Sequence, residues 1–173
     1  MSDFLQDLAR HEQPPETLPL RTIRHAGELL AQLLDPRLLA AARNLAPGEV
    51  LALDDDAGIL STVTTALTGT GLRVTGCESA EAALNAIETQ RFDTIIADVH
   101  LPQMNGPAFC AHARDLPAYR RTPILFLTVA DTLDKRAETS LSGGNEFIAK
   151  PFNVYELALK VDSWVLKQQL QLI

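Results

Sequence analysis

Residues 94–98 read TIIAD, an apolar run that ends abruptly in a carboxylate, and residues 50–54, VLALD, have the same form. Two later runs, 124–128 (ILFLT) and 146–150 (EFIAK), end in a hydroxyl and an amine instead. Strands that are apolar along their length, without alternation, are typical of a parallel sheet that helices cover on both faces. With a further run at 72–77 (LRVTGC), the chain is expected to form five strands.

The segments between these runs carry apolar residues at helical spacing. In the first segment, Ile59, Val63 and Leu67 recur on one side. Ser79 is expected to cap the next helix, because its hydroxyl can accept a backbone N–H. Since strands alternate with helices, we predict an α/β fold with a doubly wound parallel sheet. The helices are expected at about 57–68, 79–90, 107–114, 131–141 and 153–170.

The first 47 residues follow a different pattern. Residues 1–20 are polar and contain three prolines, which predicts a flexible arm. Residues 21–47 have leucines at helical spacing, and Asp35-Pro36 is typical of a cap followed by the first residue of a helix. This part is therefore expected to be a helical extension or a linker, and the α/β domain is expected to span residues 48–173.

Composition argues against several classes of function. Hydrophobic residues make up 46% of the 173-residue chain, which is enough to form a core. The formal net charge of −7 argues against nucleic-acid binding and favours cationic partners such as a divalent metal ion. No apolar run is long enough for a transmembrane helix or a signal peptide, so no membrane association is expected. Cys77 and Cys110 are expected to be buried, reduced thiols, as in a cytoplasmic protein.

Functional side chains collect where the predicted strands end. Asp54 and Asp55 follow the first strand, Asp98 ends the third, and Thr128 and Lys150 end the last two. The carboxyl ends of parallel strands form the ligand-binding edge of a doubly wound sheet, so these groups are expected to converge. Clustered carboxylates raise one another's pKa unless a cation is present, and Mg²⁺ prefers such oxygen ligands. The set therefore predicts a magnesium-dependent phosphoryl-transfer site with a carboxylate nucleophile.

From about residue 48 to residue 170, the chain resembles the receiver domains of bacterial response regulators. The resemblance implies a flavodoxin-like sheet with strand order 2-1-3-4-5. It also implies a two-component phosphorelay module, not an enzyme in the usual sense, that accepts a phosphoryl group from a histidine kinase or a phosphotransfer protein. Four motifs carry it, in the order of the family: VLALDDD (50–56), TIIADVHLPQMNG (94–106), PILFLT (123–128) and EFIAKPF (146–152).

Carried over residue by residue, the resemblance makes Asp98 the phospho-acceptor. Asp54 and Asp55 match the acidic pair that holds Mg²⁺ together with the acceptor, and Asp55 is the expected direct ligand. The backbone carbonyl of His100 would be a further ligand, while its side chain is expected to point outward. Asp56 is expected to cap the first helix of the domain and not to bind metal.

The resemblance also assigns a phosphoryl-sensing set. Thr128 and Lys150 match the hydroxyl and the amine that bind the phosphoryl group, and Phe147 matches an aromatic residue that rotates on activation. The bond before Pro151 is expected to be cis. A downstream protein, or a second copy of the chain as a homodimer, would read the change through the last helix. One departure is Val129, which follows Thr128 where the family usually has a small residue, and its bulk could slow phosphoryl transfer.

Simpler interpretations of single residues remain open. Asp54 and Asp55 could cap a helix, Lys150 could be a surface amine, Thr128 could be an ordinary β-former and Phe147 could be fixed in the core. Two other functions also remain open. The chain could be a receiver-fold scaffold or dimerisation module that is never phosphorylated. It could also be a phosphohydrolase with an aspartate nucleophile, although such enzymes commonly place a second aspartate where this chain has His100.

Overall fold

The sheet is the framework of the domain, and the computed structural model describes it within residues 45–129 and 143–171. The strands lie in the order β2-β1-β3-β4-β5, and all neighbouring strands are parallel. This order confirms the predicted flavodoxin-like, doubly wound architecture. The strands are β1 (Glu49–Leu53), β2 (Arg73–Cys77), β3 (Thr94–Asp98), β4 (Ile124–Val129) and β5 (Glu146–Lys150).

Each described helix begins at a polar side chain that accepts backbone N–H groups, which leaves fewer orphan donors at the helix start. Asp56 confirms the cap predicted for it, because its carboxylate accepts from the backbone N–H of Gly58 at 2.8 Å and of Ile59 at 3.1 Å. Ser79, Asn105 and Asn153 cap the others. The helices are α4 (Ala57–Gly69), α5 (Ala80–Thr89), α6 (Gly106–Asp115) and α8 (Val154–Gln169).

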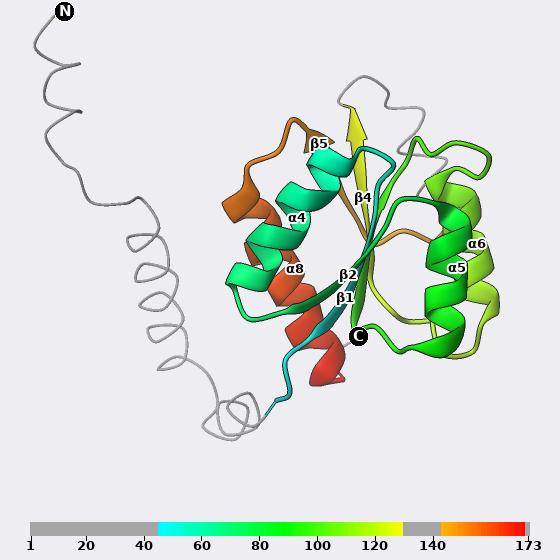
Figure 1. Cartoon of the computed structure of the whole chain (residues 1–173). Coiled ribbons are helices and arrows are strands. Elements are labelled where there is room, and N and C mark those ends of the chain that lie inside the picture. Colours follow the sequence, from blue (N-terminus) through cyan, green and yellow to red (C-terminus); the bar gives the residue numbers. More distant parts are fainter. Residues whose placement is uncertain (1–44, 130–142, 172–173) are drawn as a thin grey trace, which may run out of the picture. The chain divides into compact units, whose positions relative to one another are not determined.

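Helices cover both faces of the sheet (Figure 1). α4 and α8 pack on one face, where Val63 and Val161 are buried against the strands. α5 and α6 pack on the other face, with Ile87 and Phe109 in a second buried cluster. Since both faces are covered, β1, β3 and β4 are buried along most of their length. The edge strands β2 and β5 are more exposed, as their mixed sequences allow.

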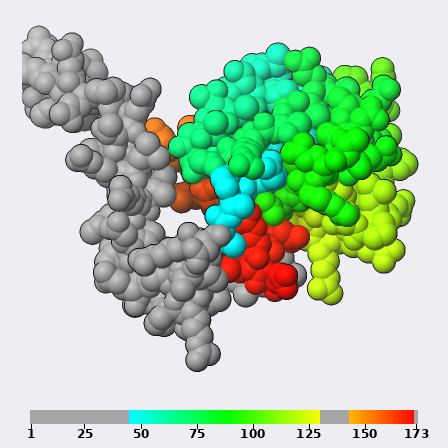
Figure 2. Space-filling view, turned by 60° about the horizontal axis from the view of Figure 1, so that its bottom comes forward, coloured from blue at the N-terminus to red at the C-terminus, as the bar shows by residue number. Residues whose placement is uncertain are grey.

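The end of α8 lies against the start of β1. The side-chain amide of Gln169 donates to the carbonyl of Ala46 at 3.3 Å and to a carboxylate oxygen of Asp93 at 3.0 Å. In Figure 2 the cyan start and the red end of the described domain accordingly lie side by side. The carboxyl ends of the strands, where the predicted site residues lie, are at the opposite end of the sheet, so these contacts do not occupy that edge.

Other expectations have mixed outcomes. Cys77 and Cys110 are both buried and neither forms a disulfide, as predicted. The predicted arm at 1–20, most of the extension at 21–47 and the predicted helix at 131–141 lie outside the described residues. Among the helices that the structure describes, none combines the length and the apolar character that a membrane crossing requires.

Candidate functional site

Three carboxylates meet at the carboxyl edge of the sheet. Leu53 lies opposite Ala97 in the register of β1 and β3, so Asp54 and Asp98 leave neighbouring strands side by side. Both are buried, with 2% and 6% of their surface exposed, whereas Asp55 is exposed. One oxygen from each of the three carboxylates lies within 4.8 Å of the others. The convergence expected from the strand ends is therefore present.

Lys150 supplies the positive charge of this cluster. It ends β5, which is separated from β3 by β4, and its long side chain reaches across to the carboxylates. Its amine lies 2.7 Å from Oδ2 of Asp54 and 3.3 Å from Oδ1 of Asp98. Only 13% of the lysine side chain is exposed, so the ion pairs are poorly screened by water. The interpretation of Lys150 as an ordinary surface amine is therefore wrong.

Burial raises the pKa of the Asp98 carboxyl above its ordinary value. The nearby positive charge of Lys150 lowers this pKa, while the charge of Asp54 raises it. A hydrogen bond from the backbone N–H of His100 also favours the ionised form of Asp98. Asp98 is thus a poorly solvated carboxylate, and the positive charge of Lys150 favours its ionised form. A poorly solvated carboxylate has less hydration to lose when it contacts another group than one that water solvates fully.

The carboxylate cluster fits a hard divalent cation. Its donors are oxygens from Asp54, Asp55 and Asp98, two buried and one open to solvent, which leaves room for water ligands. His100 is exposed, as expected for its side chain. The part predicted for its backbone carbonyl in metal binding stays a prediction.

The remaining predicted residues lie around this edge. Thr128 is buried and follows Leu127, the residue opposite Asp98 in β4, but its hydroxyl donates to the carbonyl of Val129 at 3.2 Å. Phe147 is partly buried and stacks on Phe126, with ring centroids 5.9 Å apart and ring planes 17° apart. The peptide bond from Lys150 to Pro151 is cis.

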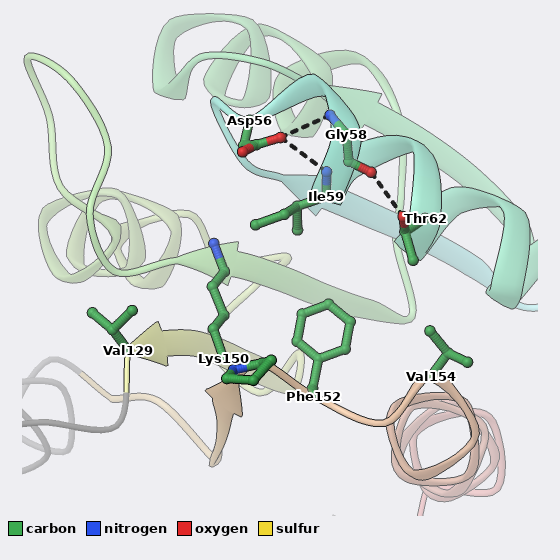
Figure 3. Close-up of a pocket in the computed structure, with 9 residues that line it drawn as sticks. Asp56, Gly58, Ile59, Thr62, Val129, Lys150, Phe152 and Val154 are labelled. Carbon is green, nitrogen blue, oxygen red and sulfur yellow. Dashed lines mark hydrogen bonds between the residues drawn. The ribbon is translucent and has the colours of Figure 1, made fainter.

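A pocket of about 540 Å³ opens beside the cluster, between the start of α4 and the segment that joins β5 to α8. Figure 3 shows the amine of Lys150 pointing from β5 toward the β1–α4 turn. Val129 lines this pocket and is 53% exposed, which places its branched side chain at the entrance and not in the core. The other lining residues are Asp56, Gly58, Ile59, Thr62, Pro151, Phe152 and Val154.

Gly106 lies directly behind Asp98, although the sequence predicted it only as part of the loop after the third strand. Its backbone N–H donates to the carbonyl of Val99 at 3.1 Å, which folds the loop after β3 back on itself. A Cβ atom at this position would lie 2.2 Å from the backbone oxygen of Asp98. Only glycine therefore allows the start of α6 to lie directly behind the strand end. The sequence signal that could have identified Gly106 is its position at the end of the DVHLPQMNG motif, residues 98–106.

Known proteins are similar to this chain in sequence and in fold. The family model for the response regulator receiver domain matches residues 50–162. Protein RcaC of Microchaete diplosiphon is 31% identical over 161 residues, which cover 93% of this chain but only 24% of RcaC. The chain thus spans about a quarter of that relative's length.

Two solved structures are similar over the same part of the chain. Chemotaxis response regulator CheY4 of Vibrio cholerae has a TM-score of 0.65 and 35% identity, covering 69% of this chain and 99% of that one. The receiver domain of sensor histidine kinase PA1611 from Pseudomonas aeruginosa has a TM-score of 0.64 and 30% identity, covering 69% and 98%. That structure contains a magnesium ion coordinated in its active site cleft.

Proposed function

Since this chain belongs to the response regulator receiver family, we propose that it accepts a phosphoryl group on Asp98 from a histidine kinase or a phosphotransfer protein. The observation that carries the proposal is the contact of Lys150 with two buried members of a three-carboxylate cluster. Asp54, Asp55 and Asp98 would hold Mg²⁺, with the backbone carbonyl of His100 as a further ligand. The magnesium ion in the PA1611 receiver supports this choice of metal.

The reaction would be a direct transfer between two side chains. A carboxylate oxygen of Asp98 attacks the phosphorus of a phosphohistidine on the partner, and the P–O bond forms as the P–N bond breaks. The electron pair of the broken bond stays on the partner's imidazole, and the product on Asp98 is an acyl phosphate. When bound, Mg²⁺ supplies positive charge to the phosphoryl oxygens. Lys150 exchanges its contact with Asp98 for one with a phosphoryl oxygen, and its contact with Asp54 holds it in place.

The switch would start from Thr128. Its hydroxyl leaves the Val129 carbonyl and donates to the phosphoryl group, and Phe147 changes its packing against Phe126. These movements shift the equilibrium between two conformations of the β4 and β5 region. A downstream protein or a second copy of the chain recognises the difference. The module itself is a signalling device of the cytoplasm and not an enzyme in the usual sense.

Labelling by a small phospho-donor tests this function. The full chain is incubated with radiolabelled acetyl phosphate, with and without Mg²⁺. We expect incorporation that requires Mg²⁺ and that hydroxylamine removes, because hydroxylamine cleaves acyl phosphates. If the folded chain takes up no label in the presence of Mg²⁺, phosphoryl acceptance is wrong and the scaffold interpretation replaces it.

Val129 is expected to limit access to Asp98, since its exposed side chain lines the pocket beside Lys150. Val129→Ala should speed phosphorylation by acetyl phosphate roughly two- to tenfold, which corresponds to a barrier lower by about 0.4–1.4 kcal/mol. The measurement is the labelling rate at saturating Mg²⁺. Val154→Ala is the matched control, because Val154 lines the same pocket from α8 and should leave the rate unchanged. If Val129→Ala and the unmodified chain are labelled at the same rate, Val129 does not limit access to Asp98.

A further inference from the structure

An exposed apolar stripe runs along α8. Tyr155, Leu159 and Leu166 are 48%, 51% and 39% exposed, and all three belong to this one helix. With Asp162 they are separated by four, three and four residues, the spacing that puts side chains on one flank of a helix. The buried side of the same helix is formed by Leu157, Ala158, Val161 and Val165, so the stripe is not part of the core.

The stripe lies on the flank of α8 that faces α4. The hydroxyl of Thr70, which caps the end of α4, donates to Asp162 at 3.3 Å. At the start of the same two helices, the pocket is lined by Ile59 and Thr62 from α4 and by Val154 from α8 (Figure 3). α4, AGILSTVTTALTG, contains no charged residue at all. On this side, α4 therefore contributes no charged side chain, and Asp162 is the one charged member of the stripe on α8.

In the described part of the chain, no cationic side chain lies beside the carboxylate of Asp162. Among the residues that the structure describes, its interactions are burial and the hydrogen bond from Thr70. Burial raises its pKa to about 6, so it is still mostly ionised at neutral pH. A half-buried carboxylate with a single neutral donor keeps unsatisfied capacity for a cation.

The lysines of α8 lie on its other flank and are engaged there. Lys160 lies 2.9 Å from Glu146 and 3.1 Å from Glu156. The amine of Lys167 lies over the ring of Trp164, 4.4 Å from its centroid. The charges of α8 are thus divided into a paired, mostly cationic flank and an apolar flank whose carboxylate has no described cation beside it.

We propose that this flank, formed by Tyr155, Leu159, Asp162 and Leu166, binds an amphipathic helix of another protein. That helix would present apolar residues to the leucines and a lysine or arginine to Asp162. A cation at this point completes the coordination of a partly desolvated carboxylate, so it adds specificity to the apolar contact. The inference stands apart from phosphoryl acceptance, since none of its residues lies in the carboxylate cluster.

A second copy of the chain fits this surface poorly. A two-fold interface about the middle of the stripe would set Asp162 against Leu159 of the other copy and bring both carboxylates within about one helical turn. Each carboxylate would lose water without gaining a cation, which opposes association at neutral pH. A partner that carries its own positive charge has no such cost.

The test uses two designed amphipathic helical peptides that differ in one residue. Both carry leucines at the stripe's spacing, and the residue that faces Asp162 is lysine in one and glutamate in the other. Fluorescence anisotropy with the full chain at neutral pH should show the lysine peptide binding about tenfold more tightly. Leu159→Ser should weaken both peptides at least fivefold, and because Leu159 is exposed this variant should keep its fold.

The matched pair of variants is Asp162→Asn and Asp115→Asn, which remove the same charge from α8 and from an exposed position at the end of α6. Asp162→Asn should abolish the preference for lysine, and Asp115→Asn should keep it. Equal binding of the two peptides by the unmodified chain would overturn the proposal, as would equal effects of the two variants. Concentration-dependent self-association that Leu159→Ser removes would assign the flank to a second copy instead, and would equally overturn it.

Discussion

Asp98→Asn is expected to reduce Mg²⁺-dependent labelling by acetyl phosphate to background. The amide has no carboxylate oxygen to attack phosphorus, and it is nearly the same size as the side chain that it replaces. Lys150 keeps its 2.7 Å contact with Asp54 in the variant, so the site should stay assembled. The labelled fraction at equal donor and metal concentration is the measurement, and circular dichroism checks that the variant is folded.

Asp115→Asn is the matched control for this variant. It makes the same chemical change in an exposed residue at the end of α6, away from the carboxylate cluster, and labelling should not change. Hydroxylamine-sensitive label that persists in Asp98→Asn would transfer the acceptor role to another residue. Asp54 and Asp55 would then be the next to test, because their oxygens lie within 4.8 Å of Asp98.

Gly106→Ala is expected to cost about 2–3 kcal/mol of unfolding free energy, in the range for overpacking against atoms that cannot move aside. The new methyl group would lie 2.2 Å from the backbone oxygen of Asp98 and 3.2 Å from the ring of Phe126. Relief of the first contact requires the backbone of β3 or of α6 to shift. Since Asp98 moves with that backbone, labelling should slow together with the loss of stability.

Gly69→Ala separates this close contact from the general effect of adding a methyl group. Gly69 is also at a helix end, and a Cβ atom there would meet nothing within 4 Å. Its alanine variant should be neutral or more stable by up to about 1 kcal/mol, because alanine is the better helix former. Chemical denaturation of both variants is the measurement, and similar unfolding free energies would contradict the close approach at Gly106.

Much of the fold follows from local pattern. Runs such as TIIAD and ILFLT are apolar at consecutive positions, and a strand can bury both of its sides only in a sheet covered on both faces. Asp56 was recognisable as a cap because capping depends on residues two and three positions away. The strand ends likewise made the meeting of Asp54, Asp98 and Lys150 predictable, since parallel strands finish at one edge.

Other features needed contacts between residues distant in the sequence. The close approach of Gly106 to Asp98, the stacking of Phe147 on Phe126 and the exposure of Val129 all depend on how separate elements pack. The exposed flank of α8 is the clearest case, because leucines at helical spacing look the same in sequence whether they are buried or not.

The amino-acid sequence is therefore sufficient to predict the class of fold, the family and the chemical character of the carboxyl edge of the sheet, because the patterns of strands and helix caps are short-range. The sequence does not show that Asp162 is half-buried beside Thr70, or that Leu159, three residues earlier on α8, is exposed. That difference arises from the packing of α8 against α4, and burial and charge pairing are properties of elements that meet only in the folded chain.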